Sequence, residues 1–216
     1  MPLRRRVEIK SQRRVLDDVF KLDEMVVSHR RYDGKMSSDQ RRLIFERGDA
    51  AAALLVNVDV RSVVLVEQFR APAMIGRRRD DPGTTDGWIT EVVAGTVGPN
   101  ETPEAAVVRE TFEETGYRIE RPELIGRFFS SPGGTSERVF LYFATVSESA
   151  RPEKGGGLGD EDISVSQVGV EELFDRLAKG QIEDPKLVIA AHWLQANLAR
   201  IETAPRAGPE GKLGSM

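Results

Sequence analysis

The sequence predicts an α/β sandwich built around a mixed sheet, with a small β-rich unit at its N-terminal end. Three observations indicate this class. Between residues 51 and 201, apolar runs typical of strands are interleaved with apolar residues at helical spacing, so both kinds of element share one core. Residues 13–48 contain strand-like runs only. The chain of 216 residues is 39% hydrophobic and 31% charged, which is ordinary for a globular protein.

The N-terminal unit is expected to span residues 1–48. Residues 13–31 and 41–48 read as short strands, and the Asp33-Gly34 pair between them is typical of a turn. A β unit of about 45 residues cannot bury a core alone. We therefore expect a second copy of the chain to cover it in a homodimer.

The main domain is expected to span residues 49–203. Apolar β-rich runs predict strands at residues 51–58, 62–70, 88–95, 124–131 and 138–146. Apolar residues at helical spacing predict closing helices at residues 170–180 and 185–201. Residues 76–87 form a loop crowded with turn formers and charged residues, and residues 204–216 are expected to be a disordered tail.

Charge and residue types exclude several functions. With a formal net charge of −4, the chain has no basic field that would attract nucleic acid or anionic lipid. The absence of cysteine excludes disulfides, thiolate nucleophiles and cysteine-based zinc sites. Two histidines, His29 and His192, argue against a multi-histidine metal site and leave acid–base chemistry to carboxylates. No run approaches the roughly 18 apolar residues of a membrane span, so we expect a cytoplasmic protein.

A helix is predicted from about Thr102 to Thr115. Thr102 and Pro103 form a good N-cap and first-turn pair, and Gly116 is a natural residue just past the C-terminal end. Glu104 suits the positive end of the helix dipole. The residues expected on the apolar side of this helix are Ala105, Val108 and Phe112.

The glutamates of the stretch RETFEETG, residues 109–116, gather on one side of the predicted helix. At about 100° per residue, Glu110, Glu113 and Glu114 share one face. Like charges at these spacings cost roughly 0.2–0.5 kcal/mol per pair when nothing neutralises them. Hard divalent cations such as Mg²⁺ or Mn²⁺ prefer oxygen ligands and often bridge carboxylates to phosphates. The pattern therefore indicates either a divalent metal site or a solvated acidic face.

The segment GTVGPNETPEAAVVRETFEETGY, residues 95–117, resembles the Nudix box, the strand–loop–helix signature of the Nudix hydrolases. It departs at one position, where the box favours an apolar residue and Thr111 stands here; we expect a small packing change only. The resemblance implies a Nudix-type α/β/α sandwich. It also implies hydrolysis of a nucleoside diphosphate that is linked to another group.

The resemblance implies a magnesium site, which Mn²⁺ could also occupy. The implied ligands are the side chains of Glu110, Glu113 and Glu114 and the backbone carbonyl of Ala94. Glu101 and Arg109 would be structural, because a buried guanidinium can tie Glu101 to the helix through a charge-assisted pair.

Most of residues 14–200 resembles the ADP-ribose pyrophosphatase branch, which carries a proline downstream of the box where Pro132 stands. The GDP-mannose pyrophosphatases share the SPGG motif and an acidic loop, so both substrates stay open. The N-terminal pattern GKMS…RRLIFERG favours ADP-ribose. A Nudix domain that binds nucleotides without hydrolysing them is a further alternative.

The same resemblance implies contacts to the substrate. Arg70, at the end of VEQFR, would contact phosphate. The residues that would line the ribose side are Ser131, Pro132, Gly133 and Glu137, although Glu137 could equally form a surface ion pair. Arg42 and Arg47 match substrate-contacting arginines of the N-terminal unit. Phe20 is a candidate base-stacking residue that reaches the other subunit's site, because this unit packs across the partner in the resembling enzymes.

The acidic loop GGGLGDEDISV, residues 155–165, is expected to supply the catalytic base. Its glycines are expected to make it mobile enough to close on substrate. Aligned from its EDI end, Glu161 falls on a metal-associated glutamate, whereas a gap makes Glu161 the base itself. Asp160 and Asp162 are the neighbouring alternatives.

Overall fold

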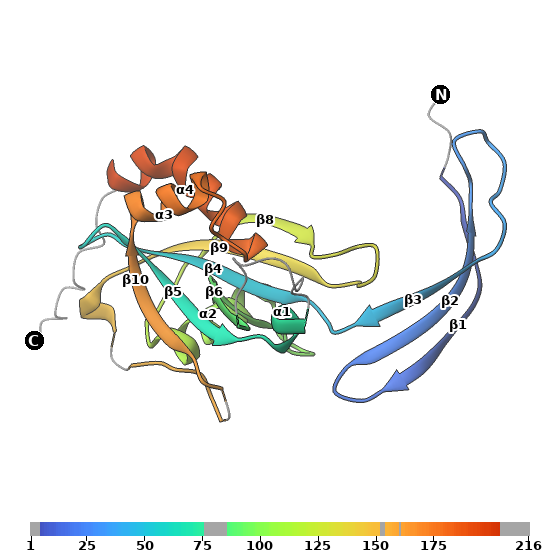
Figure 1. Cartoon of the computed structure of the whole chain (residues 1–216), viewed down its shortest axis with the longest axis horizontal. Coiled ribbons are helices and arrows are strands. Elements are labelled where there is room, and N and C mark those ends of the chain that lie inside the picture. The colour runs from blue at the N-terminus through green and yellow to red at the C-terminus, as the bar shows by residue number, and fades with distance from the viewer. Residues whose placement is uncertain (1–4, 76–85, 152–153, 160, 204–216) are drawn as a thin grey trace, which may run out of the picture.

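The computed structural model describes residues 5–75, 86–151, 154–159 and 161–203. It confirms the predicted fold class: a large mixed sheet carries helices, and a small antiparallel sheet precedes it. Figure 1 shows the small sheet standing to one side of the main body. The predicted tail, most of the loop at residues 76–87, and Asp160 lie outside the described residues.

The small sheet is an antiparallel meander of β1 (Val7–Asp17), β2 (Lys21–His29) and β3 (Gln40–Glu46). The first strand begins earlier than the sequence predicted, and a turn at residues 18–20 divides the run that we expected from residue 13 to residue 31. Nearly every residue of β1 is exposed. Because neither face of β1 is buried within the chain, its apolar residues, Val7, Ile9, Val15 and Leu16, do not alternate along its whole length.

The large sheet has the strand order β10-β5-β4-β9-β8. These strands are β4 (Ala50–Asn57), β5 (Ser62–Phe69), β8 (Glu123–Phe129), β9 (Arg138–Val146) and β10 (Ser164–Gly169). The sheet is mixed because β4 runs parallel to β9, whereas the other neighbours along this order are antiparallel. The sequence did not predict β10, nor the short helices α1 (Ala71–Ile75) and η1 (Glu148–Ala150).

The single strand predicted at residues 88–95 is wrong, because the structure divides it in two. The strand β6 (Trp88–Glu91) pairs with β5, and β7 (Val93–Thr96) pairs with β4. Between β6 and β7 the chain changes its pairing partner from β5 to β4. Apolar content predicts extended backbone but does not identify the partner strand.

Helices cover both faces of the large sheet, as Figure 1 shows. One core cluster joins Leu54 to buried residues of α3 (Val170–Ala178) and α4 (Pro185–Thr203). The other joins Leu55 to buried residues of α2 (Pro103–Thr115). Neighbouring residues of β4 therefore point into opposite layers, which gives the α/β/α sandwich.

The bounds of α2 agree with the prediction, but its buried face does not. Thr102 caps the helix by accepting a hydrogen bond from the Ala105 N–H at 3.1 Å, and Gly116 closes it with a φ of 76°. The buried residues of α2 are Ala106, Val107, Thr111, Glu114 and Thr115. Ala105 is exposed, and Val108 and Phe112 are only partly buried. Small residues allow the helix to lie close to the sheet, so the larger apolar side chains remain at its flanks.

Thr111, the one residue that departs from the box, is fully buried in α2. Its hydroxyl donates to the Val107 carbonyl at 2.7 Å, and its methyl group takes the place of an apolar side chain.

The small sheet joins the main body beyond β8, where the Phe45 N–H donates to the Gly134 carbonyl at 2.8 Å. In the described ranges, no helix is long and apolar enough to cross a membrane.

Candidate active site

The side chain of Glu114 is the most buried of the three glutamates on α2 that were predicted to bind metal. Only 4% of Glu114 is exposed, and its carboxylate accepts a hydrogen bond from the Ala94 N–H at 3.2 Å. Burial raises the pKa of Glu114 to about 8; the nearby charges of Glu110 and Glu161 add to this effect, and Arg70 opposes it. Burial is thus the main cause of the raised pKa of this carboxyl group.

Gly95, the first residue of the box, lies directly under Glu110. A Cβ atom at this position would come within 1.9 Å of the Glu110 carboxyl group. The missing side chain is what allows the carboxylate to rest against the backbone of β7. Burial also raises the pKa of Glu110, and its hydrogen bond to Arg109 opposes this effect.

Arg109 is the cation that sequence reasoning did not place among the glutamates. Its guanidinium donates to Glu101 at 3.0 and 2.9 Å, to Glu110 at 2.7 Å and to Glu113 at 3.0 Å. It also reaches the Thr96 carbonyl at 3.2 Å. Its hydrogen bonds lower the pKa of Glu101 to about 2. The geometry is that of the structural pair expected for Glu101, and the same arginine neutralises part of the acidic face.

The donor set of α2 fits a hard divalent cation. Carboxylate oxygens are the ligands that Mg²⁺ and Mn²⁺ prefer, and Glu110 and Glu114 present them on neighbouring turns. In the described part of the chain, no three acidic or histidine side chains already converge as they do in a formed metal centre. Two of these carboxyl groups have raised pKa values, so a bound cation would also relieve their unfavourable charge.

The glycine-rich loop is attached to the C-terminal end of α2. The Gly156 N–H donates to the Glu114 carbonyl at 2.8 Å, and the Gly157 N–H donates to the Glu113 carbonyl at 3.1 Å. A Cβ on Gly155 would come within 2.4 Å of the helix backbone. The mobility expected from these glycines stays a prediction, and the structure adds that they allow close approach and two backbone hydrogen bonds.

Arg151 is a further residue of this attachment that the sequence did not reveal. Its guanidinium donates to the Thr115 carbonyl at 3.1 Å and to the Lys154 carbonyl at 2.9 Å. It also lies 5.1 Å from the centre of the Tyr117 ring. Arg151 therefore ties the last turn of α2 to the start of the loop.

Glu161 lies at the far end of this loop and is exposed. Its carboxylate accepts a hydrogen bond from the Leu158 N–H at 2.9 Å, which fixes the turn that carries it. Asp162 is also exposed. A Cβ on Gly157 would come within 2.6 Å of the Glu161 Cβ, so Glu161 lies beside the glycine whose N–H is bonded to the Glu113 carbonyl at the end of α2.

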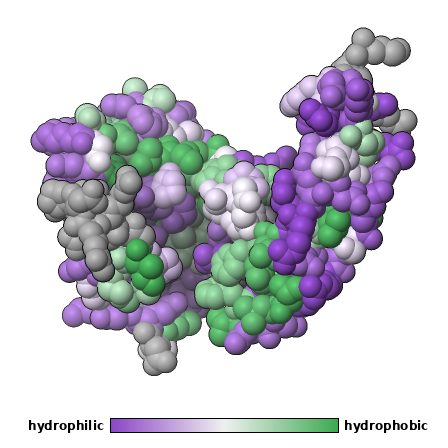
Figure 2. All heavy atoms as spheres, turned by 45° about the vertical axis from the view of Figure 1, so that its right-hand side comes forward, coloured by the Kyte–Doolittle hydropathy of each residue, from purple (hydrophilic) through white to green (hydrophobic). Residues whose placement is uncertain are grey.

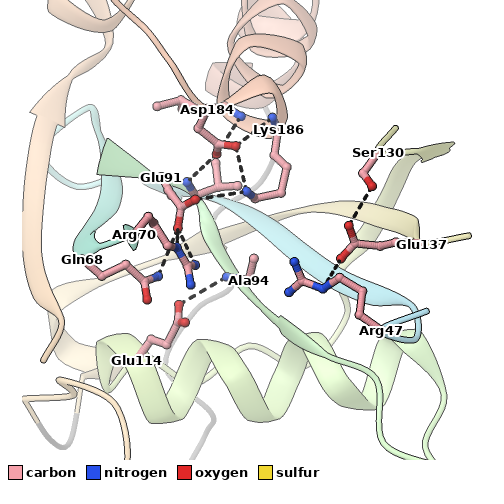
Figure 3. A network of polar contacts seen from close by, with 12 residues as sticks. Arg47, Gln68, Arg70, Glu91, Ala94, Glu114, Ser130, Glu137, Asp184 and Lys186 are labelled. Carbon is pink, nitrogen blue, oxygen red and sulfur yellow. Dashed lines mark hydrogen bonds and ion pairs between the residues drawn. The ribbon is translucent and has the colours of Figure 1, made fainter. Parts of the chain in front are cut away.

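Arg70 follows β5 and is held by Glu91. Its Nε and Nη2 atoms both donate to one carboxylate oxygen of Glu91, at 3.1 and 2.6 Å. Figure 3 shows the Arg70 guanidinium between Glu91 and Glu114. Sequence reasoning missed Glu91, although a glutamate within the apolar run WITEVVAG was a usable signal of a buried charge.

The residues predicted to line the ribose side lie on the connection between β8 and β9. Ser131, Pro132 and Gly133 form an exposed turn, closed by the Gly134 N–H and the Ser131 carbonyl at 3.0 Å. Glu137 accepts a hydrogen bond from the Ser130 hydroxyl at 2.7 Å.

Glu137 also pairs with Arg47 at 3.2 Å, as Figure 3 shows. Two predicted substrate contacts are thus partners of each other, which is the ion-pair alternative left open for Glu137.

Arg42 and Phe20 lie on the small sheet. Arg42 is exposed and donates to the Gln40 side chain at 2.6 Å. The Phe20 ring packs against Phe45, with 5.1 Å between ring centroids. Because the small sheet stands apart from α2 in Figure 1, a single chain does not bring these two residues to the glutamates.

Comparisons with known proteins agree with this geometry. Residues 46–191 match the family described as the NUDIX domain. The chain is 33% identical over 189 residues to the GDP-mannose pyrophosphatase of Cronobacter sakazakii (strain ATCC BAA-894), covering 88% of this chain and 95% of that protein. It is 31% identical over 190 residues to the GDP-mannose pyrophosphatase of Enterobacter sp. (strain 638), with coverage of 88% and 95%. The corresponding protein of Escherichia coli (strain SMS-3-5 / SECEC) is 32% identical over 181 residues, with coverage of 84% and 91%.

Proposed function

The chain belongs to the Nudix hydrolase family, and on that premise we propose that it hydrolyses the diphosphate bond of a nucleoside diphosphate sugar. The observation that carries this proposal is the buried carboxylate of Glu114. It lies on the box helix one turn from Glu110, and Figure 3 shows the Arg70 guanidinium between Glu91 and Glu114. Such a site can bind a metal ion and an anionic substrate together.

Nudix hydrolases generally use divalent metal ions, and Mg²⁺ is the ion we propose here, with Mn²⁺ as a substitute. The residues that would hold it are Glu110, Glu113, Glu114 and Glu161, with the carbonyl of Ala94. When bound, the metal neutralises the diphosphate and activates water.

Arg70 and Glu161 would supply the remaining chemistry. Arg70 would bind a phosphate oxygen through the part of its guanidinium that Glu91 leaves accessible. Glu161 would accept a proton as water attacks phosphorus and the bridging P–O bond breaks. The products are a nucleoside monophosphate and a sugar phosphate. Glu161 is exposed, which suits a group that exchanges protons with solvent.

GDP-mannose is the first substrate that we propose, because relatives that align over most of both chains carry the name GDP-mannose pyrophosphatase. ADP-ribose, which the sequence pattern favoured, is the second candidate and depends on the N-terminal motif GKMS…RRLIFERG. Both are nucleoside diphosphates joined to a sugar, so the metal helix cannot distinguish them. The groups around the base must distinguish them. A site whose polar groups bind the edge of one base leaves those buried groups unpaired when the other base is bound.

We also propose a homodimer that the small sheet holds together. Large apolar residues of this sheet are exposed in the single chain: Val7, Ile9, Leu16, Val19, Phe20 and Leu43. Figure 2 shows the surface hollowed between the small sheet and the main body, and a partner could enter there. Phe20 and Arg42 would then lie closer to the partner's active site than to the glutamates of their own chain, whereas Arg47 is paired with Glu137 of its own chain. A monomer in light scattering at micromolar concentration would contradict this proposal.

A substrate panel with purified protein tests the function. Initial rates are compared for GDP-mannose, ADP-ribose, NADH and diadenosine polyphosphates, each with Mg²⁺, with Mn²⁺ and with EDTA. We expect turnover of a nucleoside diphosphate sugar that EDTA abolishes. Tight binding of these ligands without turnover would favour a nucleotide sensor instead.

A further inference from the structure

Glu91, the last residue of β6, is a buried carboxylate with an unusual number of donors. It is 7% exposed, and one of its oxygens accepts three hydrogen bonds. Two come from Arg70 at 3.1 and 2.6 Å, and the third comes from the Gln68 side chain at 3.1 Å. A buried charge is costly unless it is paired, so the surroundings of Glu91 must keep these donors in place.

The other oxygen of Glu91 faces the start of α4. Lys186 lies 3.5 Å from it and 2.7 Å from Asp184, whose side chain is almost fully buried. Asp184 accepts hydrogen bonds from the backbone N–H groups of Leu187 at 3.2 Å and of Val92 at 3.4 Å. Figure 3 shows Asp184 and Lys186 on the side of Glu91 that is away from Glu114. Glu91 is thus fixed from behind by the helix start and by its own strand.

Among the described residues, partners of the Arg70 guanidinium lie along one edge only. Nε and Nη2 are used by Glu91, and Nη1 has no hydrogen bond to any residue in the described ranges. The side chain of Arg70 is 41% exposed, so an anion can reach it from solvent. Figure 3 shows this guanidinium between Glu91 and Glu114, so Arg70 lies beside the proposed metal-binding face of α2.

We propose that Glu91 is a positioning residue that fixes the Arg70 guanidinium for contact with the diphosphate of the substrate. An unsupported arginine on a strand end has many rotamers, and freezing them in advance removes an entropic cost of binding. Glu91 acts only through Arg70 and does not touch the substrate. This inference rests on the proposed function, because it assumes that Arg70 binds phosphate.

The alternative is that Glu91 serves only to anchor α4 through Lys186. In that case its replacement lowers stability, and any effect on ligand binding is the same whether or not Arg70 is present. A double-mutant cycle separates the two roles, because residues that act through one another are not additive.

The experiment compares Glu91→Gln, Arg70→Met and the double variant with the wild type. The dissociation constant for ADP in Mg²⁺ is measured by calorimetry, and KM and kcat are measured for GDP-mannose. Glu123→Gln is the matched control, since Glu123 also accepts two hydrogen bonds from one arginine, Arg200, at 3.0 Å each. Thermal unfolding confirms that each variant is folded.

We expect Glu91→Gln to raise KM and the ADP dissociation constant by about tenfold, the loss of one charge-assisted contact, with a smaller change in kcat. In the Arg70→Met background the same change should alter both constants by less than about twofold. Glu123→Gln should change neither.

An equal loss with and without Arg70 would overturn the inference, as would wild-type constants in Glu91→Gln. If Glu91→Gln does not fold, Glu91→Asp, which keeps the charge but shortens its reach, is compared in the same cycle. A wild type that binds ADP but hydrolyses no substrate contradicts the proposed function, while the ADP constants still decide the role of Glu91. A wild type that binds no ADP overturns the inference.

Discussion

The carboxylate of Glu114 accepts a hydrogen bond from the backbone N–H of Ala94 at 3.2 Å, which ties α2 to β7 at the centre of the acidic face. Both residues belong to the proposed metal site, one through its side chain and one through its carbonyl. The contact holds the helix against the strand through the Ala94 N–H. The carbonyl oxygen of Ala94 takes no part in this hydrogen bond. Strand and helix therefore present their oxygens from a rigid junction.

Glu114→Gln should fold normally and lose most hydrolytic activity. Burial raises the pKa of Glu114 to about 8, so a neutral amide of the same shape should not destabilise the metal-free protein. It does remove the charge that binds the cation, and we expect kcat/KM to fall by more than about 10²-fold. Unfolding in EDTA and initial rates in Mg²⁺ measure the two effects, and wild-type rates would remove Glu114 from the site.

Gly95→Ala should separate the geometry of Glu110 from the stability of the fold. The new Cβ would overlap the Glu110 carboxyl group, which can move away because it is the end of a flexible side chain. We expect a melting temperature close to that of the wild type and at least a tenfold loss of kcat/KM. The control is Gly126→Ala, where nothing lies within 4 Å of the new atom. Equal activity in the two variants would show that the position of Glu110 does not matter.

Gly155→Ala should displace the acidic loop from α2. Gly155 and Gly180 both have a φ of 66°, but only at Gly155 would a Cβ meet the backbone, at 2.4 Å. Alanine at either position costs about 1 kcal/mol of backbone strain. Only Gly155→Ala should also lower kcat, by at least about tenfold, because it moves Glu161. Similar kcat values for Gly155→Ala and Gly180→Ala would mean that the attachment to α2 plays no part in catalysis.

Glu161→Gln should lower kcat strongly, since only a positioned carboxylate can take a proton from the attacking water. Asp160→Asn and Asp162→Asn should have smaller effects. The three variants are compared at saturating substrate and Mg²⁺, where kcat is read directly. If Asp160→Asn were the most damaging change, both the alignment of the loop and the choice of base would be incorrect.

Local signals made part of this structure predictable. The N-cap of Thr102 and the left-handed turn of Gly116 depend on neighbouring residues only, so the bounds of α2 could be derived from the sequence. The spacing of the glutamates likewise fixed their common face. The rotation of α2 against the sheet was not predictable, because it depends on how closely small residues such as Ala106 can approach β4.

Contacts between distant segments were not predictable from the sequence. The pairs Arg70–Glu91 and Arg47–Glu137 join residues that periodicity cannot relate. The separate partners of β6 and β7 are of the same kind, since they depend on the order of strands in the sheet. The glycines at residues 155–157 contact the C-terminal end of α2, which is distant in sequence, so their role was not predictable either.

The decisive measurement is the kcat/KM of the purified wild type for GDP-mannose and ADP-ribose, side by side in Mg²⁺ and in EDTA, with products identified. We expect GDP-mannose to be cleaved to GMP and mannose 1-phosphate, faster than ADP-ribose is cleaved to AMP and ribose 5-phosphate, and both reactions to stop in EDTA. A clear preference for ADP-ribose would make ADP-ribose the proposed substrate in place of GDP-mannose. Binding of either sugar nucleotide without cleavage, or cleavage unaffected by EDTA, would contradict a metal-dependent hydrolase.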